Sequence, residues 1–153
     1  SSTWDIETYD YPTDLIANIE GGYTITGYSS NTNSGDNGSS WVIMIDMDGQ
    51  ENALQSFTGN NFIYSMIQTE NGDYILAGKK FDGSDAQGWI VSIEQNGTLN
   101  WERLYGNEDI ESFYSIEQTS DKGFILTGET HSNGSSDIFH VKTDPNGNVL
   151  SEE

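Results

Sequence analysis

The chain has 153 residues, of which 25 are acidic and only 5 are basic, so its formal net charge is −20. Such an acidic surface repels nucleic-acid phosphates and anionic lipid headgroups, and neither is expected as a partner. The absence of cysteine excludes disulfides and thiolate metal sites, and no apolar run approaches the roughly 18 residues of a membrane span. Aromatic residues and Gly are abundant and Ala, Leu, Lys and Arg are scarce, which predicts an all-β protein.

The first ten residues form an aromatic segment that is predicted to be a β-strand. This segment contains Trp4, Ile6 and Tyr9, and the order of its side chains is similar to that of residues 99–105. Alternating polar and apolar residues are typical of a strand with one buried face.

The rest of the chain repeats one motif three times, at a spacing of about fifty residues. Each copy has a strand that ends on Gly, and the copies are Gly22–Gly27, Asp73–Gly78 and Gly123–Gly128. A short turn of Asn, Asp and Gly precedes this strand and joins it to an earlier one, as in a β-hairpin. A third strand, which begins with an aromatic residue, a turn glycine and a fourth strand follow. The aromatic residues are Trp41, Trp89 and Phe139, and the turn glycines are Gly49, Gly97 and Gly147.

Each copy is therefore predicted to contain four short antiparallel strands. The last copy reaches Val149 and Leu150 just where its fourth strand should begin. The N-terminal segment looks like a fourth strand without a copy of its own. We therefore predict an assembly strand, in which Trp4, Ile6 and Tyr9 complete the last copy beside Val149 and Leu150.

These motifs resemble the β-propeller blade repeats of secreted bacterial and archaeal surface proteins. The resemblance covers nearly the whole chain and is strongest from Tyr64 to Gly106. It implies a propeller-type fold of four-stranded antiparallel blades, with the N-terminal strand completing the last blade and removing an unpaired sheet edge. The implied blades are blade 1 at about 11–58, blade 2 at about 60–106, and blade 3 at about 110–153 plus strand 1–10.

Three blades are fewer than the roughly four to eight of known propellers. Two chains could form a six-bladed dimer by strand exchange, the N-terminal strand could join the last blade of another molecule in a head-to-tail polymer, or the chain could belong to a longer propeller. A β-trefoil, which also has three four-stranded repeats, is the alternative fold. The aromatic-led third strands favour the propeller.

Calcium is the one cofactor that the sequence suggests, although none is required. Asp46, Asp48 and Glu51 surround a turn glycine, and Asp82 and Asp85 form a second acidic loop. Calcium prefers six to eight oxygen ligands, and carboxylates supply them. An ordinary hairpin turn is the preferred interpretation of the first segment, because the other copies keep the turn and lose the carboxylates.

Three Asn-x-Ser/Thr sequons, at Asn37, Asn96 and Asn133, are candidates for glycosylation. All three fall in predicted loops or turns, where a glycosylation acceptor must lie. Each is also an Asn-Gly dipeptide, which hairpin turns favour for their own geometry.

Aromatic residues that recur at matching positions are assigned to packing within and between blades. Tyr28 and Phe81, which directly follow a second strand, are instead candidates for ligand contact, and His131 in the third copy is added to them. The single arginine, the two histidines and the lack of a nucleophile motif give no sign of a catalytic centre, so the protein is not predicted to be an enzyme.

The sequence therefore favours a non-catalytic extracellular or cell-surface module. It would associate with itself through strand closure or exchange, as a dimer or a polymer, or with another surface protein. The alternative is a carbohydrate-binding propeller, or a fragment of a larger carbohydrate-active one, with a glycan as its partner.

Overall fold

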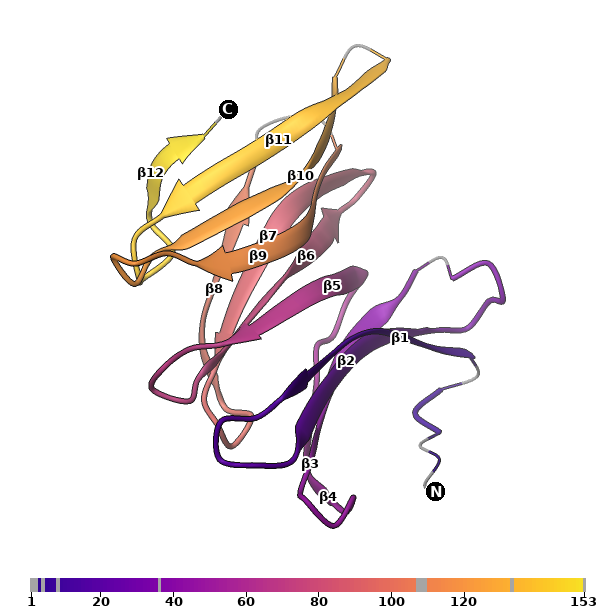
Figure 1. Ribbon diagram of the computed structural model, residues 1–153. Helices are drawn as coiled ribbons and strands as arrows, with labels where there is room; N and C mark the ends of the chain where they lie inside the picture. Colours follow the sequence, from indigo (N-terminus) through magenta and orange to yellow (C-terminus); the bar gives the residue numbers. More distant parts are fainter. Residues whose placement is uncertain are drawn as a thin grey trace.

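A computed structural model describes residues 3, 5–7, 9–35, 37–106, 110–132 and 134–152, without the side chains of Ser132 and Glu152. These residues form twelve β-strands, so the protein is all-β (Figure 1). The described part of the chain contains no helix of the length and apolarity that a membrane span requires. The strands are β1 Tyr9–Ala17, β2 Tyr23–Ser30, β3 Ser39–Ile45, β4 Glu51–Ser56, β5 Asn61–Gln68, β6 Tyr74–Asp82, β7 Asp85–Ile93, β8 Leu99–Tyr105, β9 Ile110–Gln118, β10 Phe124–Ser132, β11 Ser135–Thr143 and β12 Val149–Glu152.

The twelve strands form three successive antiparallel meanders of four strands, which we name the first unit (β1–β4), the second unit (β5–β8) and the third unit (β9–β12). The first unit is a separate four-stranded sheet, of order β1-β2-β3-β4. The second and third units are joined by one parallel bridge between Ala86 of β7 and Ile110 of β9. The described strands form open sheets, which is not the closed arrangement of a β-trefoil.

Short turns connect most strands within each unit, as the repeat predicts, and a longer loop joins β2 to β3. The expected turn glycines Gly49, Gly97 and Gly147 all have a positive φ, which is the conformation that glycine adopts without steric cost. Aspartate caps two of these turns, because the Asp46 and Asp144 side chains each accept two backbone N–H groups that follow them. The turn chemistry of the sequence is therefore confirmed at these positions.

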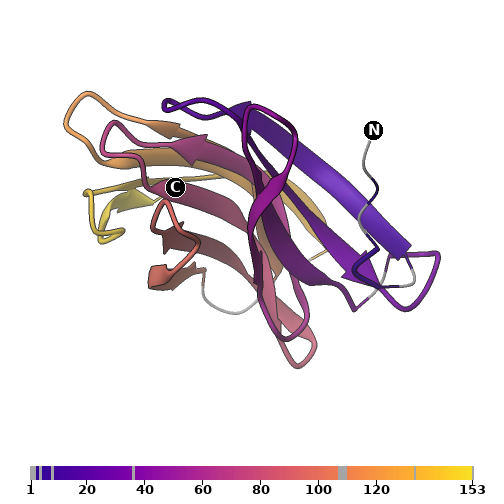
Figure 2. The same ribbon diagram turned by 90° about the horizontal axis from the view of Figure 1, so that it is seen from below.

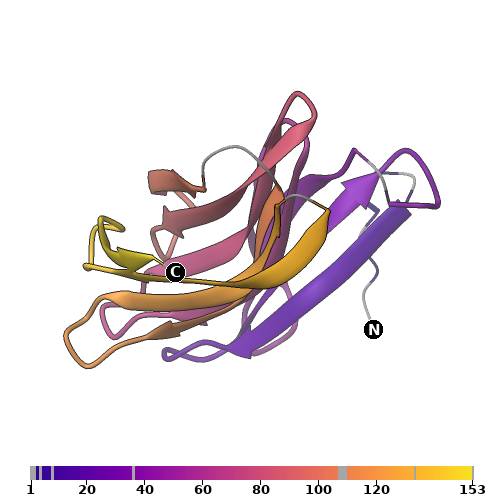
Figure 3. The same ribbon diagram turned by 90° about the horizontal axis from the view of Figure 1, so that it is seen from above.

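The units are arranged side by side, and the second unit lies between the other two (Figures 2 and 3). One core cluster, including Val42, Leu76 and Trp89, fills the space between the first and second units. Another, including Ile90 and Phe113, fills the space between the second and third units. The middle unit thus buries both faces, which explains why β7 has a nearly continuous apolar run instead of an alternating one.

The first strands of the three units approach one another, with β1 in contact with β5 and β5 in contact with β9. Two hydrogen bonds hold the first pair. The Thr13 hydroxyl donates to the Ile63 carbonyl over 2.8 Å, and the Met66 backbone N–H donates to the Asp14 carboxylate over 2.8 Å. One wall of the molecule is therefore built from first strands.

The predicted assembly strand is not formed within this chain. The chain's own β12, with Val149 and Leu150, pairs with β11 as the fourth strand of the third unit. Tyr9 instead begins β1 and pairs with Ser30, and Ile6 packs against the first unit. Trp4 lies outside the described residues. A tight turn brings β12 back to β11, and closing this short loop costs far less entropy than recruiting a strand from the other end of the chain.

Candidate functional site

Each first strand contains a β-bulge at the same place in its unit. The pairing register skips Thr13 in β1, Tyr64 in β5 and Tyr114 in β9. A bulged residue leaves the regular ladder, so its side chain is turned away from the direction that strict alternation would give it. The repeat therefore presents one re-aimed side chain from each unit on the wall of first strands.

A glycine in the second strand makes each bulge possible. These are the motif glycines Gly27, Gly78 and Gly128. A Cβ atom at each of them would lie 2.3, 1.8 and 1.7 Å from the carbonyl oxygens of Tyr11, Phe62 and Ser112, respectively. No side chain fits at such a distance, because ordinary contacts between a carbon and an oxygen begin above about 3 Å. The glycine that ends each repeat motif is therefore required by the close approach of the neighbouring strand.

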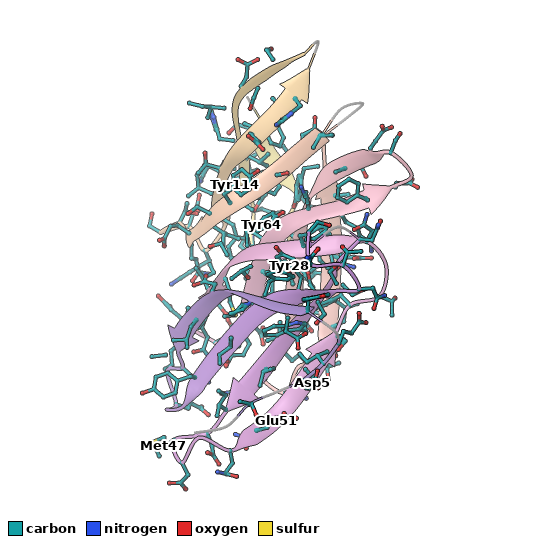
Figure 4. All side chains as sticks on the ribbon, turned by 90° about the vertical axis from the view of Figure 1, so that its right-hand side faces the viewer. Asp5, Tyr28, Met47, Glu51, Tyr64 and Tyr114 are labelled. Atoms are coloured by element: carbon teal, nitrogen blue, oxygen red, sulfur yellow. The ribbon has the colours of Figure 1, made fainter. Side chains whose placement is uncertain are left out.

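The bulges help to assemble an aromatic row across all three units. We define this row as Tyr11, Tyr28, Phe62, Tyr64 and Tyr114, together with Phe81 beside Phe62. Consecutive rings are in contact: the ring centroids are 5.1 Å apart for Tyr11 and Tyr28, 4.8 Å for Tyr28 and Phe62, 6.4 Å for Phe62 and Tyr64, and 5.3 Å for Tyr64 and Tyr114. Phe81 packs edge-on against Phe62 at 6.1 Å. Figure 4 shows Tyr28, Tyr64 and Tyr114 following one another along one face of the molecule.

The middle of the aromatic row borders a cavity of about 340 Å³, whose size falls within the range of small-ligand sites. Its lining contains four rings of the row, together with polar groups from Asn37, Asn60 and Lys79. The Lys79 ammonium lies 5.5 Å from the centroid of Phe62, 5.9 Å from that of Tyr64 and 5.3 Å from that of Phe81. These distances are typical of cation–π interactions.

A hydrogen-bonded cluster lies at the third-unit end of the row. The Tyr114 hydroxyl donates to the Glu129 carboxylate, which also accepts from the Ser136 hydroxyl over 3.1 Å. His131 Nε2 lies 3.2 Å from Glu129 Oε1. We call the aromatic row together with the cavity the groove; the polar cluster lies at its third-unit end, outside the lining of the cavity.

Burial and hydrogen bonds shift the pKa values of the groups along the groove. Burial raises the pKa of Tyr64. Burial and the hydrogen bond to Glu129 both raise the pKa of Tyr114, so the two phenols stay neutral. Burial lowers the pKa of Lys79, and the charge of Glu129 only partly opposes that effect. The hydrogen bond from Tyr114 lowers the pKa of Glu129, which is therefore a carboxylate at neutral pH.

The structure brings together two of the three predicted ligand residues. Tyr28 and Phe81 both pack against Phe62 and line the cavity, whereas His131 lies at the far end of the row. Tyr64 and Tyr114 are not among the predicted ligand residues, although Tyr114 is 46% exposed and Tyr64 is half-buried beside the cavity. Recurrence shows that a position is shared by the repeats, but it does not show which face the position occupies.

Calcium gains no support from the geometry of the acidic loops. The Asp46 carboxylate accepts the N–H groups of Asp48 and Gln50 over 2.9 and 2.8 Å, as part of its turn. Asp82 and Asp85 pair with each other at the tip of the β6–β7 hairpin. No three His, Cys, Asp or Glu side chains gather as a metal site within the described residues. Calcium binding at Asp46, Asp48 and Glu51 or at Asp82 and Asp85 stays a prediction.

Two of the glycosylation candidates lie on exposed turns. Asn37, with a φ of 55°, lies in the β2–β3 loop at the edge of the cavity, and Asn96 lies in the β7–β8 turn. The Asn96 side chain accepts the Thr98 N–H over 2.8 Å, which is a turn-stabilising role. Asn133 lies outside the described residues.

The sequence matches no protein-family model and no curated protein. The fold is similar to that of a crystal structure of a protein of unknown function from Bacteroides caccae, with a TM-score of 0.65 and 13% sequence identity. The alignment covers 98% of this chain and 48% of that one, so this chain spans about half the length of the Bacteroides protein. At this identity the likeness shows the fold alone.

Proposed function

We propose that the protein is a non-catalytic, propeller-type module of the cell exterior that binds a carbohydrate along the aromatic row. The observation that carries this proposal is the line of contacting rings that crosses all three units. Sugar rings present apolar C–H faces that stack on aromatic side chains, and their hydroxyl groups need hydrogen-bonding partners nearby. The groove supplies both, with rings along its length and Asn37, Asn60 and Glu129 beside them.

Several features support the propeller arrangement. Blades of a propeller are four-stranded antiparallel sheets set around a central channel. The three units here are four-stranded meanders that pack face to face and bring their first strands together. The similar Bacteroides protein is about twice as long as this chain, which leaves room for further units in that protein.

The carbohydrate proposal is tested on a glycan array, followed by calorimetric titration of the glycans that are retained. Tyr114→Ala is expected to weaken binding about tenfold, since an aromatic contact contributes about 0.5–1.5 kcal/mol beyond area burial. Tyr23→Ala is the matched control, because Tyr23 is 48% exposed, close to the 46% of Tyr114, and begins β2 outside the row. Retention of no glycan, or equal losses in the two variants, would reject the proposal.

Self-association is a second candidate function, which the outer face of the first unit favours. In the second unit, Trp89 packs against the preceding unit and its indole N–H donates to Glu102 over 2.9 Å. Trp41 holds the same position in the first unit, where Ile6 packs over it and a cavity of about 310 Å³ remains. The buried Trp41 Nε1 has no hydrogen-bond partner among the described residues. We propose that the third unit of a second copy packs on this face, in a ring or a head-to-tail chain.

The mass of the protein in solution, measured by light scattering over a range of concentrations, tests this assembly. Ile138 is 81% exposed in β11, where it alternates with Phe139 and Val141, which pack against the second unit, so Ile138 lies on the outer face of the third unit. Ile138→Asp should reduce association, whereas Met47→Asp, at a turn residue that is 79% exposed, should leave it unchanged. A monomer at every concentration would exclude self-association.

A further inference from the structure

Lys79 is bound differently from the other lysines. Lys80, Lys122 and Lys142 each form an ion pair with a carboxylate, at N–O distances of 3.0, 2.6 and 2.6 Å. Lys79 forms no ion pair and donates no side-chain hydrogen bond within the described part of the chain, although the protein has 25 acidic residues. Its three N–H donors are therefore not committed to another described side chain.

The position of Lys79 in the repeat shows that the fold does not require a lysine there. Lys79 follows Gly78 in β6, and the residues that follow the equivalent glycines are Tyr28 and Glu129. One backbone position thus carries an aromatic ring, a cation and a carboxylate in three successive units. The charge of Lys79 is consequently a property of this one part of the groove.

The described lining of the cavity beside Lys79 contains a single cation and no carboxylate. Three rings lie within 6 Å of the ammonium and hold it by cation–π interaction, while the cavity leaves the group accessible. A carboxylate that enters this cavity would accept charge-assisted hydrogen bonds from Lys79, which are about twice as strong as neutral ones. The rings that surround the ammonium would contact the apolar face of the same ligand residue.

We infer that the groove selects a glycan with an acidic sugar residue, a uronic acid, whose carboxylate pairs with Lys79 while its ring stacks on the aromatic row. This inference rests on the carbohydrate proposal above and names the ligand class of that site. The net charge of −20 disfavours a dense polyanion, because long-range repulsion grows with the charge of the ligand. A short acidic oligosaccharide, or a mostly neutral glycan with isolated uronic acids, fits the groove best.

The test titrates the full chain with a neutral oligosaccharide that carries one galacturonic acid residue and with its methyl ester, which keeps the same sugar rings but masks the carboxylate. The acid form should bind at least about tenfold more tightly than the ester at moderate ionic strength. Lys79→Gln should remove this preference, and Lys79→Arg should retain most of it. Lys122→Gln is the matched control, since it removes one positive charge at an exposed site on a turn and should leave the preference intact.

The possible results distinguish a failure of the acidic-ligand inference from a failure of the carbohydrate proposal on which it rests. If the ester binds as tightly as the acid, or if Lys79→Gln keeps the preference, the role of Lys79 is wrong and carbohydrate binding still stands. If neither form binds and a glycan array retains only neutral members, the acidic ligand is again rejected. If the array retains no glycan of any kind, both the inference and the carbohydrate proposal fail.

Discussion

Replacing Gly78 with alanine tests the link between the repeat motif, the β-bulge and the groove. Gly78 lies opposite the bulge of β5, and a Cβ atom there would lie only 1.8 Å from the Phe62 carbonyl oxygen. The backbone φ of Gly78 is not positive, so the substitution adds no backbone strain of the left-handed kind. Any loss of stability must therefore come from the clash with β5.

The expected loss follows from the distance. Alanine needs a separation of about 3 Å or more, so β5 and β6 would have to move apart by more than about 1 Å at a buried position. Overpacking of this kind costs typically 1–3 kcal/mol and more when backbone must move, and we expect about 3 kcal/mol here. For a chain of this size that corresponds to a fall in Tm of about 6–12 °C.

Gly49→Ala is the control for this measurement. Gly49 has a φ of 79° and no heavy atom within 4 Å of its built Cβ, so alanine there meets backbone strain without a clash. That strain costs about 1–2 kcal/mol. Urea unfolding followed by tryptophan fluorescence gives both free energies of unfolding. If Gly78→Ala is no more destabilising than Gly49→Ala, the glycine is not needed for the close approach, and the account of the bulges is wrong.

Two further predictions concern the core and the response to pH. Leu76→Ala should destabilise the protein by about 2–5 kcal/mol in urea unfolding, because Leu76 is fully buried between the first and second units. Leu54→Ala, at a side chain that is 46% exposed, should cost less than about 0.5 kcal/mol. Similar losses in the two variants would contradict the assigned core. Burial opposes ionisation of Glu102, but hydrogen bonds from Lys80 and Trp89 outweigh it and lower the pKa of the carboxyl group. The stability that the Glu102 carboxylate contributes is therefore present above the unfolded pKa of about 4.3 and is lost as the pH falls through the lower, folded pKa. Glu102→Gln should therefore lower the free energy of unfolding by up to about 1 kcal/mol at pH 7. In melting experiments, the difference in stability between the variant and the native protein should shrink below about pH 4. A difference in stability that stays constant to pH 3 would show that the charge has no role.

The sequence was sufficient to predict the strands, because their period and turn chemistry are local properties. The all-β class follows from composition, and the four-strand repeat and the turn glycines follow from spacing; the structure confirms all three. The predicted pairing of the N-terminal strand with the last unit is not formed within this chain, whereas its pairing with another chain stays a prediction. Similarity between residues 1–10 and 99–105 gave a candidate partner, but it could not show that β12 already fills the fourth-strand position.

The groove could be predicted only in part. Tyr28 and Phe81 stand out because they are not shared by the other copies, and both line the cavity. Tyr64 and Tyr114 were missed since a bulge cannot be recognised from alternation, which it interrupts by one residue. Gly78 was a usable sign of the bulge, because a glycine within an otherwise apolar strand often marks a close backbone approach.

Under the proposed function, the bulge would let this fold change its ligand without changing its scaffold. The bulged position carries Thr13, Tyr64 and Tyr114 in the three units, although the backbone at each is held by the same contact between a carbonyl and a glycine. Under the proposed function, substitutions at Tyr64 and Tyr114 would alter what the aromatic row presents while the core between the units keeps its packing, whereas Thr13 donates to the Ile63 carbonyl and serves the contact between units. Recognition and folding would then be encoded by different residues of the second and third units, and a new specificity could be engineered in either unit by itself.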